Sequence, residues 1–144
     1  EYEVFIDASL EPGHLSYGEF FIQGEESKEV LISCHVCHPS LCNDNLSGIA
    51  LTTYLAKYLA KKKLRYSYRF LFIPGTIGSI TWLAHNETKT PNIEHGLVVT
   101  CVGDGGPFTY KKSRRASAEI DRAALQVLRE SREGCPVRRS SPER

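Results

Sequence analysis

Residues Glu29–Val36, with the sequence EVLISCHV, form a nearly continuous apolar run that contains several β-branched side chains. Arg69–Ile73 (RFLFI) and Leu97–Val102 (LVVTCV) are two further runs of the same kind. Apolar runs that do not alternate with polar residues are typical of strands buried on both faces, as in parallel sheets. The three runs therefore predict the central strands of a sheet that is covered on both sides.

The segments between these runs predict helices. Asn45–Lys63 places its apolar residues mainly on one helical face, with Asn43 or Asp44 as a natural N-cap. A shorter helix is expected after Gly78, and a third over about residues 118–131. Strands that alternate with helices at this spacing predict an α/β fold, a three-layer α/β/α arrangement around a mostly parallel, mixed central sheet.

Two outer strands are expected over Tyr2–Asp7 and Tyr17–Gln23, joined by a turn through Glu11, Pro12 and Gly13. We expect one α/β domain over residues 1–133. A tail rich in Pro, Ser and Arg follows over residues 134–144 and is expected to be frayed or truncated.

The composition is that of an ordinary globular domain and excludes several classes of protein. Of the 144 residues 41% are hydrophobic and 24% charged, and the net charge of +1 offers no electrostatic basis for binding nucleic acid or an anionic membrane. No apolar run approaches the ~20 residues of a membrane span, and the acidic first residues do not resemble a signal peptide. The odd number of cysteines, five, favours free thiols and a cytoplasmic location over a disulfide framework. Because there is no methionine, we expect a piece of a longer chain, incomplete at both ends.

Polar side chains gather where the predicted strands end. The first run leads into His35–His38 and then Asn43–Gly48, the second ends at Pro74–Thr76, and Gly103–Gly106, which includes Asp104, follows the third. In open α/β sheets, ligands bind at the carboxyl ends of the parallel strands. Since carboxylates and imidazoles suit zinc or manganese, the sequence predicts a metal site at this edge of the sheet.

Strand alternation separates the candidate ligands. His35 and Cys37 point to one side of the strand, whereas Cys34 and His38 point to the other, so His35 and His38 share a metal ion only if the chain turns at Cys37. Which of the two histidines is the ligand therefore stays open. Asp44 is placed either to bind a metal or simply to cap the helix that follows.

These residues resemble the zinc aminopeptidase family, the co-catalytic metallopeptidases that include leucyl aminopeptidases and glutamate carboxypeptidases. The family has a His-x-Asp at the end of a strand, similar to His35–Cys37, and an Asp-x-x-Ser-Gly at the start of a helix, similar to Asp44–Gly48. Asp104 occupies the place of a third metal-binding residue. The resemblance implies a zinc-aminopeptidase-like fold and one or two zinc ions, or manganese, held by His35, Asp44 and Asp104, with His38 as a further candidate.

A bacterial and archaeal group of aminopeptidase-like proteins is more similar still, over about residues 1–130. The sequence departs from the zinc aminopeptidase pattern at two positions within this range. Cys37 replaces the Asp that orients the zinc-bound His, and Gly75 replaces the Glu expected as general base. A last His ligand is expected in a C-terminal segment beyond this chain. The segments that carry the closer similarity are Ser16–Glu19, Cys37–Ser40 with Asn43–Gly48, and Ile73–Ile80 (IPGTIGSI).

The resemblance implies a metal-dependent hydrolase that removes N-terminal residues from a peptide or peptide-like substrate. No residue is assigned as catalytic, because Gly75 stands in place of the expected glutamate. The alternative is a degenerate or truncated, non-catalytic domain that binds a peptide or a protein partner. Exposed sheet edges would also allow the chain to form a homo-oligomer.

Two further groups of residues have other interpretations. Cys34, Cys37 and Cys42 could form a structural zinc site, with a fourth ligand from His85, His95, Cys101 or Cys135. The basic residues of Lys111–Arg115 are either a solvated face or a binding site for an acidic group of a substrate.

Overall fold

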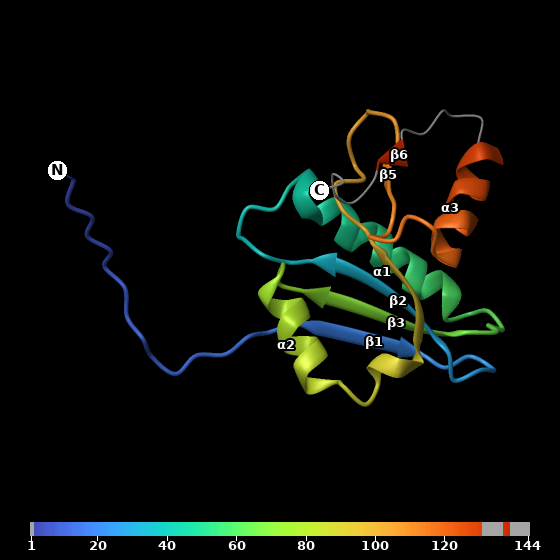
Figure 1. Ribbon diagram of the computed structural model, residues 1–144, viewed down its shortest axis with the longest axis horizontal. Helices are drawn as coiled ribbons and strands as arrows, with labels where there is room; N and C mark the ends of the chain where they lie inside the picture. Colours follow the sequence, from blue (N-terminus) through green and yellow to red (C-terminus); the bar gives the residue numbers. More distant parts are fainter. Residues whose placement is uncertain (1, 131–136, 139–144) are drawn as a thin grey trace.

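The strands predicted from the apolar runs form one mixed sheet in the computed structural model, which describes residues 2–130 and 137–138 (Figure 1). The strands are β1 (Gly18–Ile22), β2 (Glu29–His35), β3 (Ser67–Ile73) and β4 (Ile93–Val98), in the spatial order β1-β3-β2-β4. β2 pairs in parallel with both β3 and β4, and β1 pairs antiparallel with β3. The predicted α/β fold with a mostly parallel, mixed sheet is therefore confirmed.

Helices cover both faces of this sheet. On one face, α1 (Gly48–Leu59) packs Ala56 against Val30, Ile32 and Phe70. On the other, α2 (Ile77–His85) packs Trp82 against Leu71 and Ile73. Successive residues of β2 and β3 thus enter different cores, which is why these strands carry apolar runs rather than an alternating pattern. Burial of a large apolar side chain stabilises a fold by about 1.5–3 kcal/mol.

An ionic network, buried at Glu29 and Arg69, joins β1, β2, β3 and α2. The guanidinium of Arg69 donates to both carboxylate oxygens of Glu29, at 2.6 and 2.9 Å, and also to Glu19. Trp82 donates its indole N–H to the other oxygen of Glu19 at 3.1 Å. Each buried charge therefore has an opposite charge as partner, which is the condition under which a core tolerates ions.

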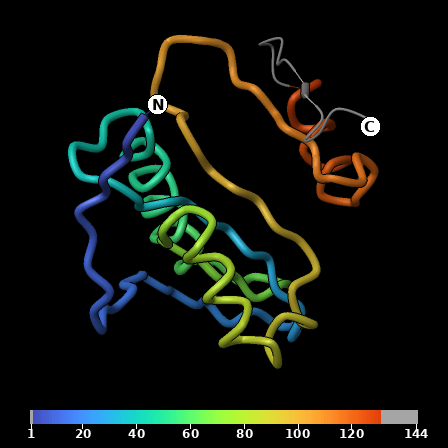
Figure 2. Tube along the Cα trace, turned by 60° about the vertical axis from the view of Figure 1, so that its left-hand side comes forward, coloured from blue at the N-terminus to red at the C-terminus, as the bar shows by residue number. Residues whose placement is uncertain are grey.

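After β4 the chain loops out before it reaches α3 (Glu119–Glu130), as Figure 2 shows. The buried carboxylate of Asp121 accepts hydrogen bonds from Tyr110, Ser113 and the backbone N–H of Ala118. Burial alone would raise the pKa of Asp121, but these hydrogen bonds outweigh it and hold the pKa below its usual value. Asp121 thereby ties the start of α3 to β5 (Tyr110–Lys111), which pairs with β6 (Val137–Arg138).

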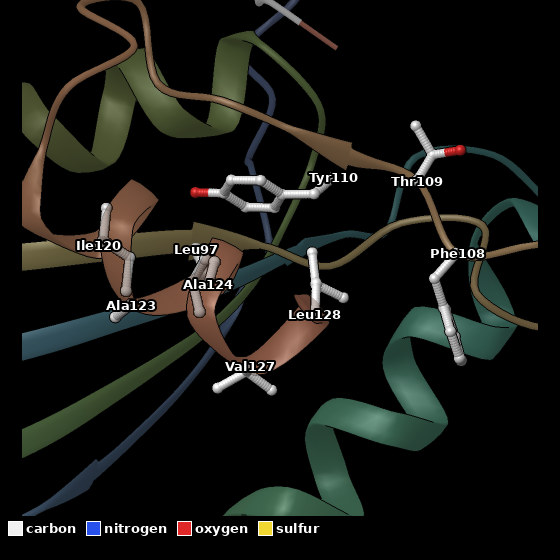
Figure 3. Close-up of a pocket in the computed structure, with 9 residues that line it drawn as sticks. All are labelled: Leu97, Phe108, Thr109, Tyr110, Ile120, Ala123, Ala124, Val127 and Leu128. Atoms are coloured by element: carbon white, nitrogen blue, oxygen red, sulfur yellow. The ribbon is translucent and has the colours of Figure 1, made fainter. Parts of the chain in front are cut away.

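An open apolar groove of about 450 Å³ separates α3 from β4 and the segment that precedes α3 (Figure 3). Leu97 of β4 lies on one side of it, and Ile120, Ala124 and Val127 of α3 lie on the other. Val127 is 66% exposed, so this face of α3 is only partly covered by the described residues.

The structure differs from the predicted strands in two places. Residues 2–17 form no regular structure, so the predicted strand over Tyr2–Asp7 is wrong. β4 begins and ends about four residues earlier than the predicted Leu97–Val102, and Asp104 consequently lies in a loop. Of the predicted tail, only Val137 and Arg138 lie within the described residues. None of the helices in the described part of the chain has the length and apolar content needed to span a bilayer.

Candidate functional site

His35 and Asp44 meet at the carboxyl end of β2. His35 is the last residue of that strand, and Asp44 lies in the short, kinked segment η1 (Asn43–Ser47) that precedes α1. The Nε2 atom of His35 lies 2.5 Å from Oδ1 of Asp44. This hydrogen bond holds the pKa of the Asp44 carboxyl below its ordinary value, and Cys101 and His38 act in the same direction. Asp44 therefore keeps its negative charge beside the imidazole.

Asp44 is not the N-cap of α1. Its backbone is extended, with φ −98° and ψ 96°, and α1 begins only at Gly48, with Ser47 as N-cap. The segment η1 intervenes, so the carboxylate is free to face His35. The same holds for Asn43, whose side-chain oxygen accepts hydrogen bonds from Ser47 and from the backbone N–H of Gly103. The prediction of an N-cap at either residue is wrong.

Asn45 is the residue of this site that sequence reasoning missed. Its side chain is fully buried, and its Oδ1 accepts a hydrogen bond from the backbone N–H of Cys101 at 3.0 Å. Its Nδ2 donates to the carbonyl oxygen of Val99 at 3.1 Å and lies 3.4 Å from Nδ1 of His35. Because the amino group faces Nδ1, the ring proton of His35 belongs on Nε2, which donates it to Asp44. Asn45 thus fixes both the ring and the ends of β2 and β4.

Asp104 is near this site but does not touch the pair. Its Oδ2 accepts a hydrogen bond from Asn43 Nδ2 at 3.1 Å, and its Oδ1 accepts from the backbone N–H of Gly106 at 2.8 Å. It also lines a cavity of about 370 Å³ together with Cys101, Phe108 and Lys111. Asp104 is therefore held beside η1 through Asn43, with a cavity on its other side.

The remaining predicted residues are arranged differently. His38 is exposed, and its Nδ1 donates to the carbonyl oxygen of Pro39 at 2.8 Å rather than joining the pair. The Cys37 sulfur accepts a hydrogen bond from the backbone N–H of Gly75 at 2.9 Å. A Cβ atom on Gly75 would lie only 2.9 Å from that sulfur, so any larger residue at position 75 requires Cys37 to move.

The alternative cysteine site is not assembled. Cys34 is fully buried on the α1 side of β2, where burial raises the pKa of its thiol, whereas Cys37 is exposed. Cys34, Cys37, Cys42 and Cys101 are all free, and Cys135 lies outside the described residues. A thiol that stays protonated in the core is a poor metal ligand.

The donor types at the His35–Asp44 pair fit zinc or manganese, since an imidazole nitrogen and an ionised carboxylate converge at a strand end. A metal at Nε2 would take the place of the proton that His35 now shares with Asp44. Within residues 2–130 and 137–138, no three His, Cys, Asp or Glu side chains are grouped closely enough to hold a metal ion. The pair therefore fits a metal in chemistry and position but needs a further ligand to complete the site.

Residues 5–142 match the family described as a domain of unknown function (DUF4910). The chain belongs to this family. A relative from Clostridium acetobutylicum, named "Putative polysaccharide biosynthesis protein with aminopeptidase-like domain", is 59% identical to it over 128 residues, which are 89% of the chain and 30% of the relative. This DUF4910 chain thus spans less than a third of the length of that relative.

Two solved structures have the same fold as this DUF4910 chain. A "putative peptidase" from Clostridium acetobutylicum aligns with a TM-score of 0.85 and 53% identity, over 88% of the chain and 30% of that protein. A "Peptidase M28 precursor" from Shewanella amazonensis aligns with a TM-score of 0.60 and 17% identity, over 86% of the chain and 30% of that protein. The second likeness shows the fold alone.

Proposed function

We propose that this chain is the metal-binding part of an aminopeptidase-like hydrolase that acts on peptide N-termini. The observation that carries the proposal is the meeting of His35 and Asp44 at the carboxyl end of β2, where open α/β sheets bind their ligands. The printed names of the relatives, one with an aminopeptidase-like domain and one a peptidase, support a peptidase-like domain. A metal ion at such a site activates water and polarises a substrate carbonyl.

The residues of this chain have distinct parts in that proposal. His35 and Asp44 would hold the ion, with Asp104, which is hydrogen-bonded to Asn43 of η1, as the candidate for a further ligand. Asn45 is a positioning residue, because its amide fixes the ring of His35. The cavity beside Asp104, with Lys111 on its rim, would take the peptide. Zinc and manganese both suit this donor set.

No general base is proposed at position 75. A glutamate that shuttles the proton contributes typically 10²–10⁴-fold to such a hydrolysis, and Gly75 has no side chain to do so. We therefore expect metal binding without efficient turnover in this chain.

The test is the metal content of the 144-residue chain, purified without chelator and measured by mass spectrometry. Wild type is expected to carry zinc or manganese, and Asp44→Ala is expected to lose it. Glu11→Ala is the matched control, because Glu11 is an exposed carboxylate far from the pair in sequence, and it should retain the metal. Metal-free wild-type protein, or metal retained in Asp44→Ala, would contradict the proposal.

The non-catalytic alternative also has an observation in its favour. The sulfur of Cys37 is hydrogen-bonded at the place where a side chain of residue 75 would begin. A side chain at position 75, where the resemblance expects a glutamate, would therefore meet Cys37, which favours a domain that binds peptides without cleaving them. A folded, metal-free chain that binds peptides would support this second function.

A further inference from the structure

We propose that residues 2–7 of one copy of this chain add as a strand to the free edge of β1 in a second copy, so that two chains exchange these segments. The proposal is independent of the proposed hydrolase function. It rests on three features of the structure: an extended segment with exposed apolar side chains, an unpaired sheet edge, and an apolar groove beside that edge.

The segment before β1 leaves the sheet and runs away from it with no regular structure (Figure 1). Its large apolar side chains make almost no contacts, as shown by Phe5, which is 88% exposed, and Leu10, which is 105% exposed. Tyr2, Val4 and Ile6 are similarly open. Apolar side chains gathered in this way favour association, because each gains free energy on leaving water.

β1 offers an edge with apolar side chains on both faces. It pairs with β3 alone, so its other side is unpaired within the described part of the chain. Phe20 points toward α1 and is 47% exposed, while Phe21 lies on the opposite face beside Arg69 and is 39% exposed. A strand added here would extend both faces of the sheet beside these phenylalanines, so it would need apolar residues of both parities.

Residues 2–7 have that pattern. In an extended conformation, Val4 and Ile6 point to one face, and Phe5 points to the other with Glu3 and Asp7 on either side of it. A strand with one face in the core and the other in water would carry apolar residues on one face only. Residues 2–7 therefore carry apolar side chains for both faces of β1, which exposes a phenylalanine on each.

The charges of residues 2–7 also complement those beside the edge of β1. Between β1, β3 and α1 lies an apolar groove of about 480 Å³, which Phe20, Phe72, Ala56 and Ala60 line and which Lys57 and Lys61 border. Neither lysine forms an ion pair within the residues that the structure describes. With Phe5 in the groove, Glu3 and Asp7 of the added strand would lie on the side of these two lysines.

The strand that pairs with the free edge of β1 comes from a second copy, because residues 2–7 run away from the sheet of their own copy. Residues 8–17, which contain Pro12 and Gly13, would then be the hinge of an exchange in which each copy gives one strand and receives one. Such reciprocal contacts close on themselves with two-fold symmetry. The expected product is a dimer and not a longer assembly.

The first test is light scattering on the 144-residue chain, under reducing conditions, over a wide range of concentration. Wild type is expected to form a dimer, and Phe5→Asp should weaken the dimer by about tenfold or more, because a phenylalanine no longer leaves water. Leu10→Asp is the matched control: it changes an equally exposed residue outside residues 2–7 and should leave the dimer intact. Neither variant removes a contact within one copy, so both should fold.

The second test exchanges charges. Lys57→Glu with Lys61→Glu is expected to weaken the dimer, and adding Glu3→Lys with Asp7→Lys in the same chain is expected to restore it. A wild-type monomer at every concentration would overturn the proposal, as would a dimer that Phe5→Asp leaves unchanged. A monomer whose residues 2–7 resist proteolysis would show instead that the segment folds onto its own β1, and would equally overturn the exchange.

Discussion

The side-chain amide of Asn45 holds together the residues of the candidate site. It is fully buried, and it hydrogen-bonds across the ends of two strands while it faces the ring of His35. We expect Asn45→Ala to lower the free energy of unfolding by about 1–3 kcal/mol, because backbone groups near Val99 and Cys101 lose their partners. Chemical denaturation measures this, with the exposed Asn92→Ala as control. A loss no larger than that of the control would argue against the role given to Asn45.

Gly75 and Cys37 must be changed together to restore a general base. Gly75→Glu alone would bring its Cβ to 2.9 Å from the Cys37 sulfur, so the side chain of Cys37 has to rotate away. We expect Cys37→Ala combined with Gly75→Glu to raise the rate of peptide hydrolysis by about 10²–10⁴-fold over wild type, and Gly75→Glu alone to gain less. Rates on an aminopeptidase substrate, measured with metal bound, check this. No gain in the folded, metal-loaded double variant would mean that the base belongs elsewhere.

At the scale of elements, Asp121 makes the attachment of α3 sensitive to acid. Its pKa is lower in the folded chain than the ordinary value of about 3.9, so it stabilises the fold fully above that pH, and the stabilisation is lost as the pH falls through the folded pKa. We expect the difference in unfolding free energy between wild type and Asp121→Asn to be constant near neutral pH and to shrink below about pH 4. Thermal or urea unfolding across this range measures it. A difference that does not vary with pH would contradict this account.

The elements themselves could mostly be predicted from the sequence, because β2, β3, α1 and α2 have strong apolar patterns of their own. That His35 and Asp44 lie at the same edge was expected from the rule that ligands bind at strand ends, whereas the choice between His35 and His38 could not be made from the sequence. The role of Asn45 could not be predicted, because an Asn before a helix usually makes a local turn and its long-range partners, Val99 and Cys101, lie more than fifty residues away. The strand predicted over Tyr2–Asp7 is absent because a strand forms only when it pairs with a neighbouring strand. The apolar pattern of one segment does not show whether such a neighbour is available.

For the molecule as a whole, the chain spans 30% of the length of its relatives and leaves both edges of its sheet unpaired in the described part of the chain. The two edges differ in character. β1 exposes a phenylalanine on each face, whereas β4 lies beside the apolar groove that Figure 3 shows. Each edge is thus an opportunity for association, and the exchange of residues 2–7 would use only the first.

The attachment of α3 has a consequence for the motions of the molecule. β2 and β3 are held by a ladder of seven residue pairs and by two cores, whereas α3 borders an open groove and is anchored at its first turn by Asp121. Regions held by few buried contacts open locally without unfolding the rest. In hydrogen–deuterium exchange, the amides of α3 should therefore exchange long before those of β2 and β3. The sheet would keep its hydrogen bonds while this helix opens locally, so α3 is expected to be the first regular element of the described chain to lose protection.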